Sequence, residues 1–311
     1  MILRTRLGGF TLATIFSLVL TLSLSACSGA EETDGRPLVV TTTMMLEDAV
    51  NRLAGDHLNV VGLMGPGVDP HLYRATPRDI RNLDRADLII YNGLFLEARL
   101  SEILEKIEGR TFAAAEVIPE EKLIAETEFG GVFDPHVWFD VNLWKLVTTG
   151  VAEQLVQLIP EHEEEITHNK IEFLEELDAL HTWVYEQIQQ IPAERRFLIT
   201  AHDAFGYFGQ AYNIEVKGLQ GLNTQTEVGI QDITRMVRFI IDNEIPAIFL
   251  ETSIAPRPIQ SLENGVRERG GSVELGGELF SDAMGERGTE KGTYIGMFRY
   301  NVEIITNALK K

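Results

Sequence analysis

The chain has 311 residues, a net charge of −20 and a single cysteine. Its length is enough for two domains of ordinary size, and 44% hydrophobic residues can supply their cores without disulfide bonds. The acidic balance excludes the basic surface that a nucleic-acid-binding protein needs, so no nucleic-acid partner is expected.

The first 26 residues have the pattern of a secretory signal. A short positive segment precedes an apolar stretch over residues 7–24. The following Leu-Ser-Ala-Cys resembles a bacterial lipoprotein signal box, which implies cleavage before Cys27 and a lipid on its thiol. Because the stretch is about as long as a membrane span, an uncleaved anchor is the alternative. Residues 27–36 are small and polar, which predicts a flexible tether at the outer face of the bacterial cytoplasmic membrane.

Residues 37–160 alternate β-branched runs with helical patterns. Strands are predicted at 38–43, 58–64 and 87–93, and helices at 45–55, 76–86, 95–107 and 142–158. Thr76 and Pro77 are a strong helix start, as N-cap and first helical residue. Repeating βα units predict a mainly parallel sheet with helices on both faces.

A long helix is predicted over residues 161–192. From 161 to 191 the sequence has no glycine or proline, and apolar residues recur mostly every three or four positions. Thirty helical residues would span on the order of 45 Å, which suits a rigid rod joining two lobes.

The βα pattern then resumes in residues 193–311. Strands are predicted at 196–200, 214–219, 247–252 and 272–277, and helices from about 203 and at 230–243, 258–269 and 294–309. The predicted fold is therefore α/β, with an N-terminal lobe (37–160) and a C-terminal lobe (193–311) joined by one linking helix. A cleft between lobes is a usual place for a ligand.

Three of the seven histidines lie in loops or at strand ends. His71 occurs in GVDPHLY, His136 in VFDPHVW and His202 in LITAH. Ligand groups gather at the carboxyl ends of strands in open α/β sheets. The other four histidines are interpreted as exposed or packed structural residues: His57, His162, His168 and His181.

Three neutral imidazoles in one place would suit a transition metal such as zinc. The best fourth ligand is Asp282 in ELFSDAMG, just past a predicted strand. Spacing alone leaves open that the three histidines are unrelated.

Six blocks occur in order along the chain: DPHLYRATPRD, DPHVWFD, TAHDAFGYF, FLETS, SDAMG and GTYIGMFRYN. Together they resemble the metal-binding class of ABC-transporter solute-binding proteins, the zinc- and manganese-uptake lipoproteins. The resemblance covers essentially the whole mature chain. It implies two α/β lobes, a long linking helix and one divalent metal held by His71, His136, His202 and Asp282. It also implies delivery to a permease, with its ATPase, on separate chains, by a monomeric receptor.

Carboxylates near these positions are candidates to orient the ligands. Asp69 and Asp134, from the two DPH tripeptides, are predicted to orient loops or accept from imidazole N–H groups. For four weaker candidates a salt bridge or helix cap is an equally good interpretation: Asp79, Asp140, Asp203 and Glu251.

The sequence predicts Zn²⁺ first and Mn²⁺ second. A histidine at position 202 resembles the zinc carriers, and imidazole favours zinc over manganese. However, the segment EVIPEEKLIAETEFGG has no histidine, unlike many zinc members, and some members with three histidines and an aspartate are linked to manganese.

We do not expect an enzyme. No HExxH or GxSxG pattern occurs, and four protein ligands leave zinc no open position. A metallohydrolase is therefore disfavoured, and an adhesin-type surface lipoprotein is a secondary alternative of another class.

Overall fold

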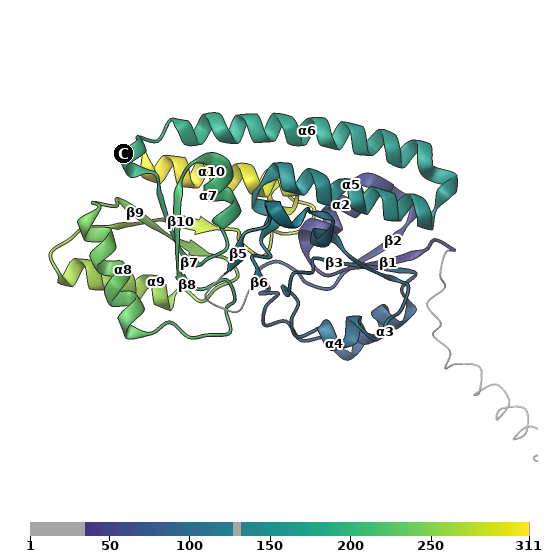
Figure 1. Cartoon of the computed structure of the whole chain (residues 1–311), viewed down its shortest axis with the longest axis horizontal. Coiled ribbons are helices and arrows are strands. Elements are labelled where there is room, and N and C mark those ends of the chain that lie inside the picture. Colours follow the sequence, from purple (N-terminus) through teal and green to yellow (C-terminus); the bar gives the residue numbers. More distant parts are fainter. Residues whose placement is uncertain (1–34, 127–131, 311) are drawn as a thin grey trace, which may run out of the picture. The chain divides into compact units, whose positions relative to one another are not determined.

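The computed structural model describes residues 35–126 and 132–310 (Figure 1). The chain from Pro37 onward forms one compact unit. The predicted signal peptide, Cys27 and most of the tether lie outside the described residues. Within the described ranges, no helix is both long and apolar enough to cross a membrane.

The N-terminal half is built on a four-stranded parallel sheet in the order β2-β1-β3-β4. Alternate residues of β1 face opposite sides: Val39 packs in the core that contains α2, and Val40 in the core that contains α3 and α4. Helices therefore cover both faces, as predicted. The elements are β1 (Leu38–Thr41), α2 (Met44–Ala54), β2 (Asn59–Gly62), α3 (Pro77–Arg85), β3 (Leu88–Tyr91), α4 (Ser101–Leu104) and β4 (Thr111–Ala113).

The helix predicted over 95–107 is wrong in extent, because only Ser101–Leu104 is α-helical. Leu94 and Phe95 have φ of 52° and 64°, and an α-helix cannot include residues with positive φ, so no helix begins at residue 95. The buried Glu97 carboxylate draws the chain inward: it accepts hydrogen bonds from the Thr42 hydroxyl (2.6 Å) and from the backbone N–H groups of residues 92 and 93 (2.8 and 3.1 Å). These tertiary contacts outweigh the local helical pattern.

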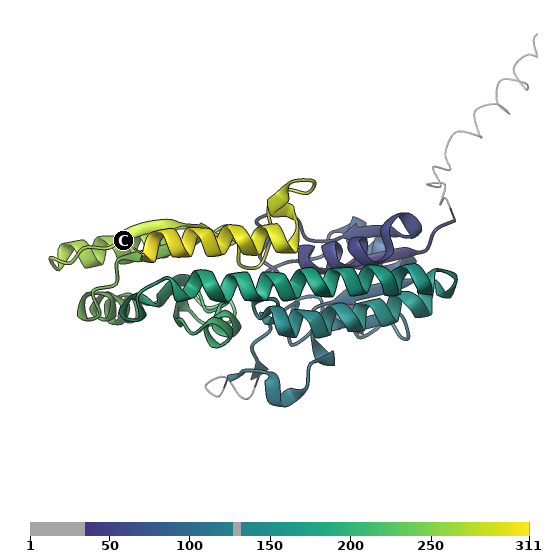
Figure 2. The same cartoon turned by 90° about the horizontal axis from the view of Figure 1, so that it is seen from above.

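The long helix is present as α6 (Glu163–Gln189), 27 residues that follow α5 (Val141–Leu158) and the short 3-10 helix η5 (Pro160–His162). It lies along α5, α2 and α10 (Figures 1 and 2). One face of α6 is buried there through Ile166, Phe173, Leu177, Leu180, Val184 and Ile188. The predicted lobe boundaries on either side of it stay predictions.

The C-terminal half pairs its strands in parallel, β7 with β8 and β9 with β10, and β7 lies beside β9. Ile199 and Ile248 pack beneath α8 and α9, whereas Leu198 and Phe249 pack in the core that contains α10. The elements are β7 (Phe197–His202), α7 (Gly206–Tyr212), β8 (Glu215–Gln220), α8 (Ile230–Asp242), β9 (Ala247–Glu251), α9 (Arg257–Glu268), β10 (Glu274–Leu279) and α10 (Tyr294–Leu309).

Two details differ from the prediction. β10 begins two residues later than expected, and its register with β9 shifts between Leu275 and Gly277. A short antiparallel pair, β5 (Ala125–Glu126) and β6 (Val132–Phe133), precedes the second DPH tripeptide and was not predicted.

Candidate metal centre

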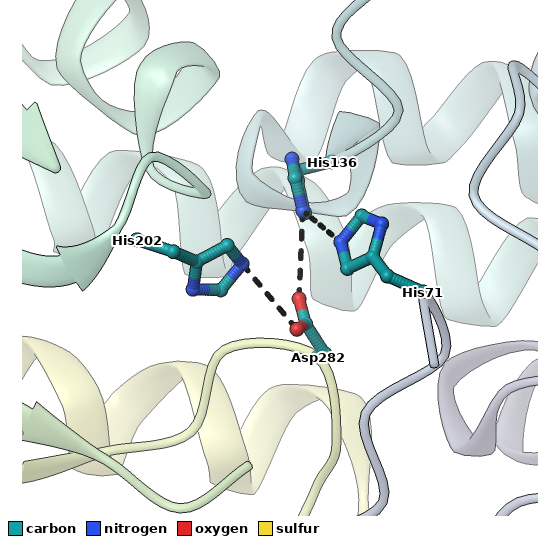
Figure 3. A group of neighbouring side chains, drawn as sticks. All are labelled: His71, His136, His202 and Asp282. Atoms are coloured by element: carbon teal, nitrogen blue, oxygen red, sulfur yellow. Dashed lines mark hydrogen bonds and ion pairs between the residues drawn. The ribbon is translucent and has the colours of Figure 1, made fainter. Parts of the chain in front are cut away.

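The structure brings His71, His136, His202 and Asp282 together (Figure 3). His71 lies in the loop after β2, and His136 directly precedes the 3-10 helix η4 (Val137–Phe139). His202 is the last residue of β7, and Asp282 follows β10. All four are at most 3% exposed. The cluster therefore joins residues from both halves of the chain in a water-excluded place.

The donor atoms of the four side chains converge. The Nε2 atoms of His71 and His136 are 3.2 Å apart, and Asp282 Oδ1 lies 3.5 Å from His136 Nε2. Asp282 Oδ2 lies 3.3 Å from His202 Nε2, and all four donors lie within 4.8 Å of one another. Tetrahedral zinc with ligands at about 2.0–2.1 Å has ligand-to-ligand distances of about 3.3 Å. These three edges thus match the size of a transition-metal shell.

Each DPH tripeptide folds into the same local turn. The His71 backbone N–H donates to Asp69 Oδ1 (2.8 Å), and the His136 N–H donates to Asp134 Oδ1 (2.9 Å). Such a side-chain acceptor two residues upstream closes an Asx turn. The repeat therefore fixes the backbone of two histidines in the same way.

Two carboxylates also set the tautomers of their histidines. Asp134 Oδ1 accepts from His136 Nδ1 (2.7 Å), and Glu251 Oε2 accepts from His202 Nδ1 (2.6 Å). Glu251 Oε1 accepts from the His202 backbone N–H as well (2.9 Å). With the proton on Nδ1, the lone pair of Nε2 faces the centre of the cluster. The imidazoles are thereby oriented as ligands.

Trp138 contacts the segments that carry two of the candidate ligands, and the sequence alone does not identify it as part of the site. Its indole N–H donates to the carbonyl of Ser281, one residue before Asp282 (3.0 Å). Its ring meets the His136 ring edge-on, with centroids 5.2 Å apart at 72°. Its position two residues after His136 is the one signal in the sequence, and that spacing alone does not predict a contact with the site.

Burial and charge shift the pKa values at the centre in opposite directions. Burial lowers the pKa of His71 to about 3, so its imidazole is neutral at physiological pH. Burial also opposes the charged form of His202, but the carboxylates of Glu251 and Asp282 outweigh it and raise the pKa of His202 well above its usual value. Burial likewise opposes ionisation of Asp282, yet the neighbouring imidazoles, His202 foremost, hold its pKa below the usual range.

Three polar atoms at the centre are buried and make no well-formed hydrogen bond, although they lie at ion-pair distance from one another or from His136: both carboxylate oxygens of Asp282 and Nε2 of His202. Buried polar atoms are nearly always hydrogen-bonded in proteins, so orphans that face one another indicate a missing partner. A cation would satisfy all three. The residues present thus fit a metal ion held by three nitrogens and a carboxylate.

The weaker carboxylate candidates differ in what their side chains contact. Glu251 contacts a histidine of the centre, as described above. Asp79 forms a capping box with Thr76 at the start of α3, and Asp140 is the N-cap of α5. Asp203 directly follows β7, and its backbone N–H donates to the carbonyl of Gly221 (3.5 Å). For Asp79 and Asp140, the alternative interpretation as helix caps is the one the structure supports.

Parallel α/β sheets, one long helix and a buried set of imidazole and carboxylate donors are the features of a solute-binding protein of the metal-binding class. Comparison with known proteins identifies the family. The family described as zinc-uptake complex component A, periplasmic (ZnuA), matches residues 39–308, and the chain belongs to it. It comprises solute-binding proteins and not enzymes, so both the resemblance and the expectation of a non-enzyme are confirmed.

Two relatives and one solved structure place the chain within this family. It is 47% identical to the zinc-binding protein TroA of Treponema pallidum over 89% of this chain and 90% of that protein. It is 42% identical to the manganese-binding lipoprotein MntA of Bacillus subtilis over 97% and 99% of the two chains. The structure of the periplasmic zinc-binding protein TroA superposes with a TM-score of 0.87, covering 89% of this chain and all of that one.

Proposed function

We propose that this protein is the extracytoplasmic receptor of an ABC importer and that it binds one divalent transition-metal ion as cargo. His71, His136, His202 and Asp282 would be its ligands. The observation that carries the proposal is the convergence of three Nε2 atoms and a carboxylate in a buried place, with two of the imidazoles oriented by carboxylates at Nδ1. It is supported by two relatives that are named as zinc-binding and manganese-binding proteins.

We propose zinc as the first candidate cargo. Three imidazole nitrogens and one carboxylate are a donor set that zinc prefers, whereas manganese prefers oxygen ligands. The ligand-to-ligand distances of 3.2–3.5 Å match a four-coordinate shell of short bonds. The relative with 47% identity is named as zinc-binding.

Manganese is the second candidate, and a specific finding favours it. The Bacillus relative is named as manganese-binding and aligns over almost the full length of both chains. Both oxygens of Asp282 point into the centre, so a bidentate carboxylate would give manganese a five-coordinate site. The geometry thus leaves room for the harder ion.

Capture would begin at the two imidazoles from the N-terminal half. Burial keeps the pKa of His71 low, so its imidazole is neutral and ready to ligate, and Asp134 holds the His136 ring by its Nδ1 with Nε2 toward the centre. His202 must release a proton before Nε2 can bind, and Asp282 supplies the negative charge. We propose that a permease and an ATPase on separate chains accept the ion from the loaded receptor, and that a lipid on Cys27 holds the receptor at the membrane.

A competition titration tests the proposal. Chelator-stripped mature protein, residues 28–311, is titrated with Zn²⁺ and with Mn²⁺ at neutral pH, and heat is recorded. Tight zinc binding at the central site that excess manganese does not displace supports a zinc carrier. Tight, saturable manganese binding makes manganese uptake the leading function.

Two histidine variants locate the ion. His202→Ala should abolish tight binding while the metal-free protein stays folded. His168→Ala is the matched control, because His168 is exposed on α6 and faces Glu172 rather than the centre. Tight binding that survives in His202→Ala, or no binding of either metal by the unaltered protein, would refute the four-ligand centre.

A further inference from the structure

We infer that the protein carries a second, peripheral transition-metal site formed by His57, His162 and Glu165. These residues are separate from the proposed cargo centre. No sequence pattern groups them, since His57 and Glu165 are 108 positions apart. The chain fold brings them together on the surface.

The three side chains present ligand atoms within 4.8 Å of one another. His57 Nε2 lies 2.9 Å from Glu165 Oε2. The rings of His57 and His162 stack with centroids 3.7 Å apart and an angle of 22° between their planes. Two imidazoles and one carboxylate are the ligand set of many three-residue zinc sites.

The helices α2 and α6 beside this cluster are held together by side-chain contacts. The Asn169 side-chain amide donates to the carbonyl of Leu53 (3.0 Å), which ties α6 to the end of α2 just before His57. Arg52 pairs with Glu176 on α6 and lies over the ring of Phe173 at 4.2 Å. The segment that carries His57 is therefore fixed against the helix that carries Glu165, which lowers the entropic cost of assembling the ligands.

The cluster and the cargo centre are reached from opposite ends of strand β2. His57 ends the 3-10 helix η1 (Gly55–His57), two residues before β2 begins, and His71 follows the other end of that strand. Figure 1 shows α5 turning into α6 at one end of the molecule, and the contacts of His57 with Glu165 and of Leu53 with Asn169 join the start of α6 to the segment before β2. An ion at the cluster would thus bind without touching the cargo centre.

The chemistry favours borderline cations. Imidazole-rich sites bind Zn²⁺, Cu²⁺ or Ni²⁺ in preference to Mn²⁺, Mg²⁺ or Ca²⁺. The side chains of His57 and Glu165 are 29% and 54% exposed, so water completes the shell and binding is weaker than at the buried centre. Glu163, Glu164 and Glu165 form the first turn of α6 and offset the positive end of the helix dipole.

Metal binding would change the stacked arrangement. A metal ion lies close to the plane of each imidazole that binds it, so two nearly parallel rings cannot both ligate one ion without turning. The stack is then the metal-free state, and the ring of His162 or His57 must rotate when the ion enters. This rotation gives a signal that a purely structural pair of histidines would not show.

The test titrates metal-free mature protein with Zn²⁺, so that the first equivalent fills the cargo centre in a first step. A second equivalent of Zn²⁺ is added while heat and the ¹⁵N resonances of the histidine rings are recorded. We expect a second, weaker binding step that shifts the His57 and His162 resonances. His57→Ala, His162→Ala and Glu165→Gln should each weaken the second step by about tenfold or more, because each removes a ligand. The first step should be unchanged.

His168→Ala is again the control, since it removes an exposed histidine from the same helix and should leave both steps intact. The inference is overturned if zinc shifts neither the His57 nor the His162 ring resonances of the unaltered protein. It is also overturned if the second step persists in both His57→Ala and His162→Ala. Loss of the first step in the unaltered protein would instead contradict the proposed cargo centre, so the two failures are distinguishable.

Discussion

Replacing Glu251 with glutamine tests whether the carboxylate behind His202 sets its metal affinity. Glu251 accepts two hydrogen bonds from this residue, at 2.6 Å from Nδ1 and 2.9 Å from the backbone nitrogen. A glutamine has one acceptor oxygen, so its NH₂ group must face one of these two donors. Either the backbone N–H loses its partner, or the ring takes the tautomer with hydrogen on Nε2, which cannot ligate.

Loss of such an orienting partner typically reduces metal affinity by about 10–100-fold, or about 1.4–2.7 kcal/mol. Removing Glu251 also lowers the pKa of His202, which weakens proton competition, so the loss of affinity should be larger at pH 8 than at pH 6. Competition against a chelator measures both values. Asp48→Asn is the control, because Asp48 accepts from the backbone N–H of Tyr294 and contacts no imidazole of the centre. Zinc affinity within twofold of the unaltered protein at both pH values would refute the reasoning.

Three further outcomes are expected. Zinc affinity should fall as pH falls, by up to about tenfold per pH unit below the raised pKa of His202, because the metal must displace that proton while His71 stays neutral; equal heats in buffers of different ionisation enthalpy would contradict proton release. Saturating zinc should raise the melting temperature by mass action, and His202→Ala should remove most of that shift. Arg287→Ala should lower the free energy of unfolding by about 1 kcal/mol, because Arg287 binds both oxygens of Glu47 and the Met64 carbonyl at a partly exposed place; an unchanged denaturation midpoint would show that this contact contributes nothing.

The alternation of strand and helix patterns predicted most of the fold, because each local pattern agrees with its tertiary surroundings. Thr76 and Pro77 start α3 as expected, and α6 falls inside the predicted range. The helix prediction for residues 95–107 was wrong in extent because Glu97 is buried against Thr42, a residue 55 positions away in the sequence. No local pattern reports such a contact.

The DPH repeats and the strand ends pointed to the candidate histidines, and the six sequence blocks that resemble the family joined them with Asp282 into one predicted site. Their supporting residues could not be ranked in the same way. Glu251 and Asp140 looked alike as acids near element ends, yet one faces His202 and the other caps a helix. The difference arises because β7 and β9 lie side by side, which a single sequence does not reveal.

The two DPH tripeptides also show how one motif supports two different tasks. Both aspartates accept the backbone N–H of their histidine, but only Asp134 reaches the ring nitrogen. Asp69 instead accepts from the hydroxyl of Thr224 in the C-terminal half. The first copy therefore ties the His71 loop to the other half of the chain, whereas the second fixes a tautomer. Asp69→Asn should consequently disturb the contact between the halves, and Asp134→Asn the ligand itself, although the local turn is the same in both.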